Sequence, residues 1–235
     1  MTNFESPPQH SPIDVEGPSP LWPRHLADLF LRPRRFFTDQ LALGKTPYAV
    51  LVAWCYGVSA SIDRLDQELI RAGLGKPRPG WENLAPYVVD WWPGFWMFVL
   101  TTGTLGGLLI WWFGGWWFAL RVRWCGAANP DHRLARLVMV YSAFVHAAPN
   151  IAAAVIYGFF FASYSKAFFA DEAYSVILIV FPFWSSFVSY TGVRTLFGVS
   201  AWRARWWFLI LPWLFYLVVM GVFAALFASL PDHPA

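Results

Sequence analysis

The chain has 235 residues, of which 57% are hydrophobic and only 13% are charged, and its formal net charge is +3. An ordinary soluble domain carries about 25% charged residues, and 16 tryptophans with 22 phenylalanines exceed what a soluble core of this length can bury. The composition therefore excludes a soluble enzyme and predicts an all-α, polytopic membrane protein, because a bilayer solvates apolar surface and draws Trp to its interfaces.

The first 20 residues form the most polar stretch of the chain. They are rich in proline, mildly acidic and without an apolar run of the kind found in signal peptides. Such a sequence buries too little apolar surface to offset the entropy of ordering it. We expect residues 1–20 to be a disordered tail.

Residues 21–44 have the pattern of an amphipathic helix that lies in the plane of the membrane. Leu26, Leu29 and Phe30 share one face, and a second apolar face follows Pro33. Arginines occupy much of the opposite face, as in helices whose apolar side enters the bilayer and whose cations meet the headgroups. The expected membrane-surface contacts are Arg32, Arg34, Arg35, Phe36 and Phe37.

Five later segments are apolar and long enough to cross a bilayer, which takes about 20 helical residues for a core of about 30 Å. They lie at about residues 46–62, 94–120, 137–164, 173–193 and 206–230. The first is the weakest because it is short and contains two serines, Ser59 and Ser61. We predict a five-span helical domain over residues 45–230, followed by a short tail at 231–235.

The distribution of Lys and Arg predicts the orientation of these spans. Twelve of the 17 basic residues precede the first span or lie in the second-to-third and fourth-to-fifth loops, and five lie in the other two loops. Because cytoplasmic loops carry the excess of positive charge, we expect a cytoplasmic N-terminus and a C-terminus on the opposite side. The outer loop at 63–90 should begin with a short amphipathic helix, which is either separate or a continuation of the first span. The mixed charges of this helix are expected to form a solvated face.

Small residues recur at four-residue spacing in two of the spans. Gly103 and Gly107 have GxxxG spacing, and Ala143 and Ala147 repeat it in the third span. Small residues let helix backbones approach closely. The pattern predicts packing seams and identifies no ligand.

One polar group of residues interrupts the apolar spans. His146 and Asn150 share a helix face at i, i+4 spacing, and Pro149 removes a backbone hydrogen bond and should kink the helix. No Asp, Glu, Lys or Arg lies near the middle of a predicted span. Two interpretations stay open: a mid-membrane polar pocket or hinge, and, with more weight, an interhelical hydrogen-bonded pair that holds the bundle together.

The usual sequence patterns of catalysis are absent: no HExxH, GxSxG, Walker or Asp-rich metal motif occurs. Cys125 and His132 fall short of the four ligands of a zinc site, and we expect Cys55 and Cys125 to be free thiols. Arginines at span ends are explained by orientation and by anionic lipid headgroups. We therefore expect no catalytic residue, no metal, no cofactor and no nucleic-acid partner.

Three stretches resemble the Yip (Ypt-interacting protein) family, in particular its bacterial members. They are the P-R-x-F-F element Pro33-Arg34-Arg35-Phe36-Phe37, the turn "CGAANPDHRLARLVMVYSAFVHAAP" and the turn "GVRTLFGVSAWRARWWFLILP". The resemblance covers about residues 26–230 and implies a five-span bundle in the bacterial inner membrane, with a cytoplasmic N-terminus and a periplasmic C-terminus. Eukaryotic members bind Rab GTPases and carry an Asp-Leu-Tyr-Gly-Pro element that this chain lacks, so Rab binding is not carried over.

Two hypotheses of function follow. The first is a non-enzymatic membrane protein that acts as an adaptor, assembly factor or membrane organiser, through the lipid bilayer and a membrane-protein partner or self-association. The alternative is a permease, flippase or transporter subunit for an uncharged or lipid-like substrate, with His146 and Asn150 on its path. A membrane enzyme ranks third, because the residues offer no catalytic set.

Overall fold

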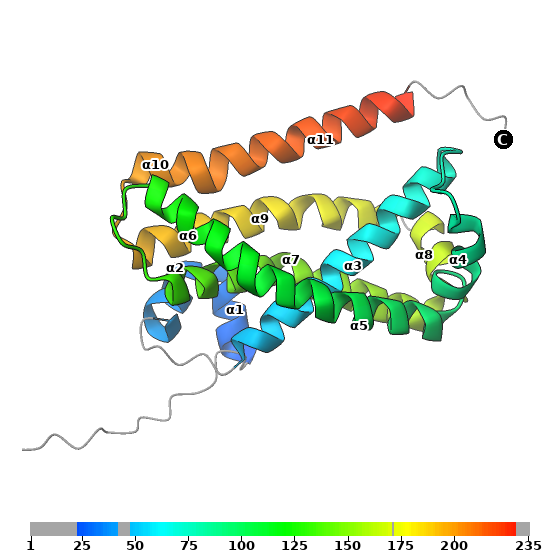
Figure 1. Ribbon diagram of the computed structural model, residues 1–235, viewed down its shortest axis with the longest axis horizontal. Coiled ribbons are helices and arrows are strands. Elements are labelled where there is room, and N and C mark those ends of the chain that lie inside the picture. The colour runs from blue at the N-terminus through cyan, green and yellow to red at the C-terminus, as the bar shows by residue number, and fades with distance from the viewer. Residues whose placement is uncertain (1–22, 42–47, 171, 229–235) are drawn as a thin grey trace, which may run out of the picture.

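The computed structural model describes residues 23–41, 48–170 and 172–228, and all regular structure within them is helical (Figure 1). The predicted tails at 1–20 and 231–235 lie outside the described residues, as do residues 42–47 before the first long helix.

Five long helical segments build the body of the molecule. They are α3 (Ala49–Gly73), α5 (Trp92–Leu109) with α6 (Gly115–Trp124), α7 (His132–Phe160), α9 (Glu172–Leu196), and α10 (Ala201–Arg205) with α11 (Leu211–Ala228). Single π-helical turns, η2 (Ile110–Gly114) and η3 (Trp206–Ile210), join α5 to α6 and α10 to α11 without interrupting the helix. The remaining elements are short: α1 (Pro23–Leu31), α2 (Pro33–Phe36), η1 (Phe37–Leu41), α4 (Trp81–Val88) and α8 (Tyr164–Ala170).

Three of the long segments are long and apolar enough to cross a membrane by length and hydropathy: Trp92–Trp124, His132–Phe160 and Ala201–Val222. They match the predicted second, third and fifth spans. The helices α3 and α9 are each 25 residues long and lie at the places of the predicted first and fourth spans. The protein is therefore an integral membrane protein with at least these three apolar helices.

The helix α7 lies at the centre of the bundle and α11 at its edge. α7 packs on α3, α6 and α9, whereas α11 contacts α9 and η3 (Figure 1). In the most apolar window of each segment, 39% of residues are buried for α7 and only 6% for Ala201–Val222, the segment that contains the start of α11. The outer surface of α11 is apolar and, in a bilayer, is solvated by lipid.

The closest helix contact joins α3 to α5 through glycines. A Cβ added to Gly57 would lie 2.1 Å from the Gly103 carbonyl oxygen, and one added to Gly103 would lie 2.7 Å from the Val58 Cα. A Cβ on Gly107 would lie 3.1 Å from the Ala53 carbonyl oxygen. The predicted packing role of Gly103 and Gly107 is confirmed, and Gly57 is its counterpart on α3.

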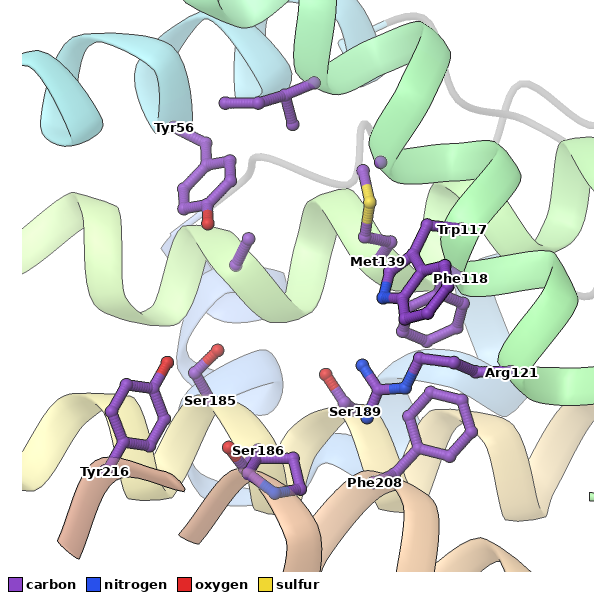
Figure 2. Close-up of a pocket in the computed structure, with 14 residues that line it drawn as sticks. Tyr56, Trp117, Phe118, Arg121, Met139, Ser185, Ser186, Ser189, Phe208 and Tyr216 are labelled. Carbon is purple, nitrogen blue, oxygen red and sulfur yellow. The ribbon is translucent and has the colours of Figure 1, made fainter. Parts of the chain in front are cut away.

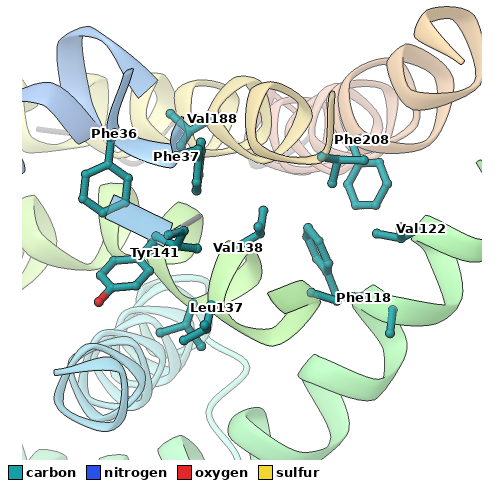
Figure 3. Close-up of a cluster of buried hydrophobic side chains, with 14 of the residues drawn as sticks. Phe36, Phe37, Phe118, Val122, Leu137, Val138, Tyr141, Val188 and Phe208 are labelled. Carbon is teal, nitrogen blue, oxygen red and sulfur yellow. The ribbon is translucent and has the colours of Figure 1, made fainter. Parts of the chain in front are cut away.

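The N-terminal elements α1, α2 and η1 fold against the bundle, and their apolar face is covered by protein. Phe36 and Phe37 are 1% and 0% exposed. The Phe36 ring lies edge-on to Tyr141 of α7, with ring centroids 5.2 Å apart, and both phenylalanines belong to the main hydrophobic core (Figure 3). The structure thus corrects the expected membrane contact of Phe36 and Phe37: α7 and α9 supply the apolar surface that the bilayer was expected to supply.

The first predicted span lies within a longer helix, α3, which continues to Gly73. The amphipathic segment expected in the outer loop is therefore the second half of the same helix, the continuation that the sequence pattern allowed. Glycines with positive φ, Gly75 and Gly80, then turn the chain into the short helix α4. The charges of this region pair at its surface: Glu68 lies 3.0 Å from both Arg71 and Arg78.

We expect the substitution Gly103→Ala to destabilise the protein by about 1–3 kcal/mol, because its methyl group would force the α3 and α5 backbones apart. The matched control is Gly106→Ala on the same helix, where the nearest atom to the new Cβ, the Gly57 Cα, is 3.8 Å away. That control should be neutral or slightly stabilising, since alanine favours a helix over glycine. Thermal unfolding in detergent, followed by tryptophan fluorescence, measures the stability of both variants. Equal losses of stability would contradict a close backbone contact between α3 and α5 at Gly103.

Candidate functional site

The predicted polar residues of the third span face α3 near the middle of α7. Asn150 is 1% exposed, and its side-chain amide donates hydrogen bonds to the Ser59 hydroxyl at 2.9 Å and to the Asp63 carboxylate at 2.8 Å. One turn earlier on α7, His146 Nε2 lies 3.5 Å from the second oxygen of Asp63. The structure therefore brings His146 and Asn150 together on one carboxylate.

Pro149 lies inside α7, which continues without a break from His132 to Phe160. Because proline has no backbone N–H, it cannot donate to the carbonyl group one turn earlier, that of Val145. The segment is thus a point of reduced backbone hydrogen bonding directly beside Asn150. The helix around it is held by side-chain bonds to α3 rather than by its own backbone alone.

The aspartate in this cluster lies outside the predicted spans. Asp63 is the first residue after the predicted first span, and the continuation of α3 places it opposite the midpoint of α7. A carboxylate there is expensive unless it is paired. Asn150 and His146 supply that pairing, and so the three residues form one interhelical unit.

A second polar contact lies one turn further along α3. Asp66 is 6% exposed and accepts a hydrogen bond of 2.7 Å from the hydroxyl of Tyr164, the first residue of α8. The Tyr164 ring stacks on Phe95 at 4.3 Å between centroids. Nearby, Trp92 donates a hydrogen bond of 2.9 Å to the Phe161 carbonyl oxygen. These contacts tie α3, α5 and the end of α7 together.

Only one oxygen of the buried Asp66 carboxyl group is paired. The other, Oδ2, has no hydrogen-bond partner among the described residues.

The predicted arginine surface forms a separate region on α1, α2 and η1. Arg32, Arg34 and Arg35 are exposed, and Arg35 Nε lies 3.4 Å from an Asp39 carboxylate oxygen on the same face. The same region includes Trp184 of α9, whose indole N–H donates a hydrogen bond of 2.8 Å to the Phe30 carbonyl oxygen. The arginines and the two phenylalanines of this segment thus point to different surroundings.

Sequence reasoning identified only one side of the site. It found His146, Asn150 and Pro149 but missed Ser59, Asp63, Asp66 and Tyr164. A usable pattern was present, because Ser59, Asp63 and Asp66 have i, i+4, i+7 spacing and share one helix face if the helix continues past residue 62. Within the described residues, no group of three or more His, Cys, Asp or Glu side chains is arranged to hold a metal ion.

Comparison with known proteins gives one match. The family model described as the Yip1 domain matches residues 27–223. No curated protein and no solved structure matches the chain. The matched range includes the arginine segment, the α3–α7 polar unit and almost all of the described part of the bundle.

We expect Asn150→Ala to destabilise the bundle by about 0.5–2 kcal/mol, the range of interhelical hydrogen bonds in membranes. The double-mutant cycle with Ser59→Ala should show a positive coupling energy, because the two side chains are bonded directly. Thermal unfolding in detergent gives the values, and Asn83→Ala, at an exposed position of α4, is the control. Purely additive effects of the Ser59 and Asn150 substitutions would contradict the pairing.

Proposed function

Because the chain belongs to the Yip1-domain family, we propose that it is a five-span membrane protein that acts without catalysis, as an adaptor, assembly or membrane-organising factor. The observation that carries this proposal is that buried polar side chains of α3 hydrogen-bond to side chains of α7 and α8. Asn150 is bonded to Ser59 and Asp63, and Asp66 to Tyr164. Groups that hydrogen-bond each other across helices hold a scaffold together, whereas a catalytic set has to face a substrate.

The proposed topology includes α3 and α9 as the first and fourth spans. Each is long enough to cross a hydrocarbon core at a rise of 1.5 Å per residue. The positive-inside distribution supports a cytoplasmic N-terminus and a C-terminus on the opposite side. The resemblance to bacterial members of the family supports the bacterial inner membrane as the location, with the C-terminus in the periplasm. In this orientation Arg32, Arg34 and Arg35 contact anionic lipid headgroups at the cytoplasmic surface.

A membrane-protein partner, or a second copy of the chain, is the expected target of this scaffold. Affinity capture of the full-length protein in mild detergent should recover one defined partner in a fixed ratio. The matched variants are Arg34→Gln with Arg35→Gln, which should weaken the association with anionic vesicles at low salt by about tenfold. A protein that always purifies alone as a monomer, with vesicle binding unaffected by both substitutions, would contradict the proposal.

The topology has an independent test. A reporter that is active only in the periplasm, fused after Ala235, should be active, and the same reporter placed before Met1 should be inactive. Both reporters on the same side would mean an even number of spans, and the five-span proposal would be wrong.

A transport function is the second candidate, favoured by the Asp63–His146 contact on facing helices. Carboxylate–histidine pairs inside membranes mark ion and substrate paths in other proteins. Proteoliposomes loaded with an uncharged or lipid-like substrate would show flux that collapses with His146→Ala or Asn150→Ala. Absence of flux with the wild-type protein would dismiss this candidate.

A further inference from the structure

A cavity of about 290 Å³ lies inside the bundle, away from the α3–α7 polar unit. It is enclosed by α3, α6, α7, α9 and the junction of η3 with α11 (Figure 2). Four polar side chains from four different segments reach it: Arg121 of α6, Ser189 of α9, Tyr56 of α3 and Tyr216 of α11. Groups so far apart in the sequence meet in this space only because the bundle folds.

The cation of this cavity has no anionic partner. The Arg121 guanidinium donates a hydrogen bond to the Trp207 carbonyl oxygen and lies 4.3 Å from the centre of the Phe208 ring. No acidic side chain lines the cavity, and within the described part of the chain no carboxylate forms an ion pair with Arg121. A guanidinium has five N–H donors, so most of them stay available for an anion.

Hydroxyl donors surround the same space. Ser185 and Ser186 also line the cavity, but they donate to the carbonyl oxygens of Ser142 and Pro182. The hydroxyls of Ser189, Tyr56 and Tyr216 form no hydrogen bond with any described residue. Figure 2 shows the Ser189 hydroxyl beside the Arg121 guanidinium, whereas the two tyrosine rings enter from opposite sides at the other end of the cavity with their hydroxyls directed toward each other. A guanidinium with an unengaged hydroxyl donor beside it can bind a phosphate group through charge-assisted hydrogen bonds.

The rest of the lining is apolar and reaches the lipid-facing surface. Ile110, Met139 and Pro212 supply hydrocarbon walls, and Trp117 lines the cavity while 48% of its side chain is exposed. Arg121 lies near the end of the Trp92–Trp124 segment, the level at which phospholipid headgroups begin. The site therefore offers polar contacts at headgroup depth and an apolar exit past Trp117 for an acyl chain.

We propose that this cavity binds the phosphate headgroup of an anionic phospholipid, with Arg121 as the counter-charge and Ser189 as the hydrogen-bond donor beside it, while Tyr56 and Tyr216 line the far end of the cavity. The cavity holds a cation and no carboxylate, so it favours phosphatidylglycerol, with its single negative charge, over zwitterionic phosphatidylcholine. The site depends only on the bundle being embedded in a membrane, and it is independent of the adaptor function proposed above.

The test uses full-length protein that has been delipidated in detergent. Phosphatidylglycerol, phosphatidylcholine and inorganic phosphate are titrated separately, with native mass spectrometry and tryptophan-fluorescence melting as readouts. Phosphatidylglycerol should be retained and should raise the melting temperature, phosphatidylcholine should bind at least tenfold more weakly, and inorganic phosphate should not bind at millimolar concentration. Phosphatidylcholine binding equal to that of phosphatidylglycerol, or free phosphate binding as tightly as the lipid, would overturn the assignment.

Matched variants locate the bound lipid. Arg121→Gln should lower the affinity for phosphatidylglycerol about tenfold or more, the loss of one charged hydrogen bond. Arg123→Gln, at an exposed position two residues away, should bind as the wild type does. Since Arg121 also contacts Trp207 and Phe208, Ser189→Ala serves as a second variant, with an expected loss of about fivefold. Affinities unchanged in both Arg121→Gln and Ser189→Ala, or lowered equally by Arg123→Gln, would overturn the proposal.

Discussion

The close approach of α3 to α5 is the constraint on which the rest of the bundle depends. At Gly57 and Gly103 the two backbones are nearer than any side chain would allow, so the lateral position of α3 is fixed. Once α3 lies between α5 and α7, its polar face at Ser59, Asp63 and Asp66 is directed toward α7 and α8. Asn150 of α7 and Tyr164 of α8 provide hydrogen bonds to that face. Polar groups inside a membrane need partners within the protein, because lipid offers none.

The sequence predicted the long helices well, because an apolar run of about 20 residues has few other uses. It also predicted the glycine seam and the shared face of His146 and Asn150, since both follow from helical spacing. It left open whether the first helix continues past its apolar run. The apolar run ends before Asp63, but the helix continues, because an aspartate that is paired with a histidine and an asparagine on the next helix costs far less than an isolated one. Only the tertiary arrangement supplies that information.

The N-terminal segment shows a different limit of sequence reasoning. Helical spacing correctly separated an apolar face, containing Phe36 and Phe37, from a face of arginines. Periodicity reveals that a face is covered without revealing what covers it, because a bilayer and the side of a helix bundle are equally apolar. Here Tyr141 and the neighbouring core provide the cover. The arginines stay exposed under either arrangement, which is why their assignment did not depend on the phenylalanines.

The bundle is held unevenly, and this asymmetry relates the scaffold to the cavity. The α3–α5–α7 side is fixed by glycine contacts and bonded polar pairs. The C-terminal segment is held by aromatic pairs, Phe118 with Phe208 of η3 and Phe183 with Trp213 of α11, and by the hydrogen bond from the Trp213 indole to the Phe183 carbonyl oxygen. The cavity around Arg121 lies on this second side, against the least buried of the three apolar segments. The polar unit and the cavity therefore occupy different parts of the bundle: the first joins α3 to α7 by buried hydrogen bonds, and the second keeps a cation beside η3 and α11.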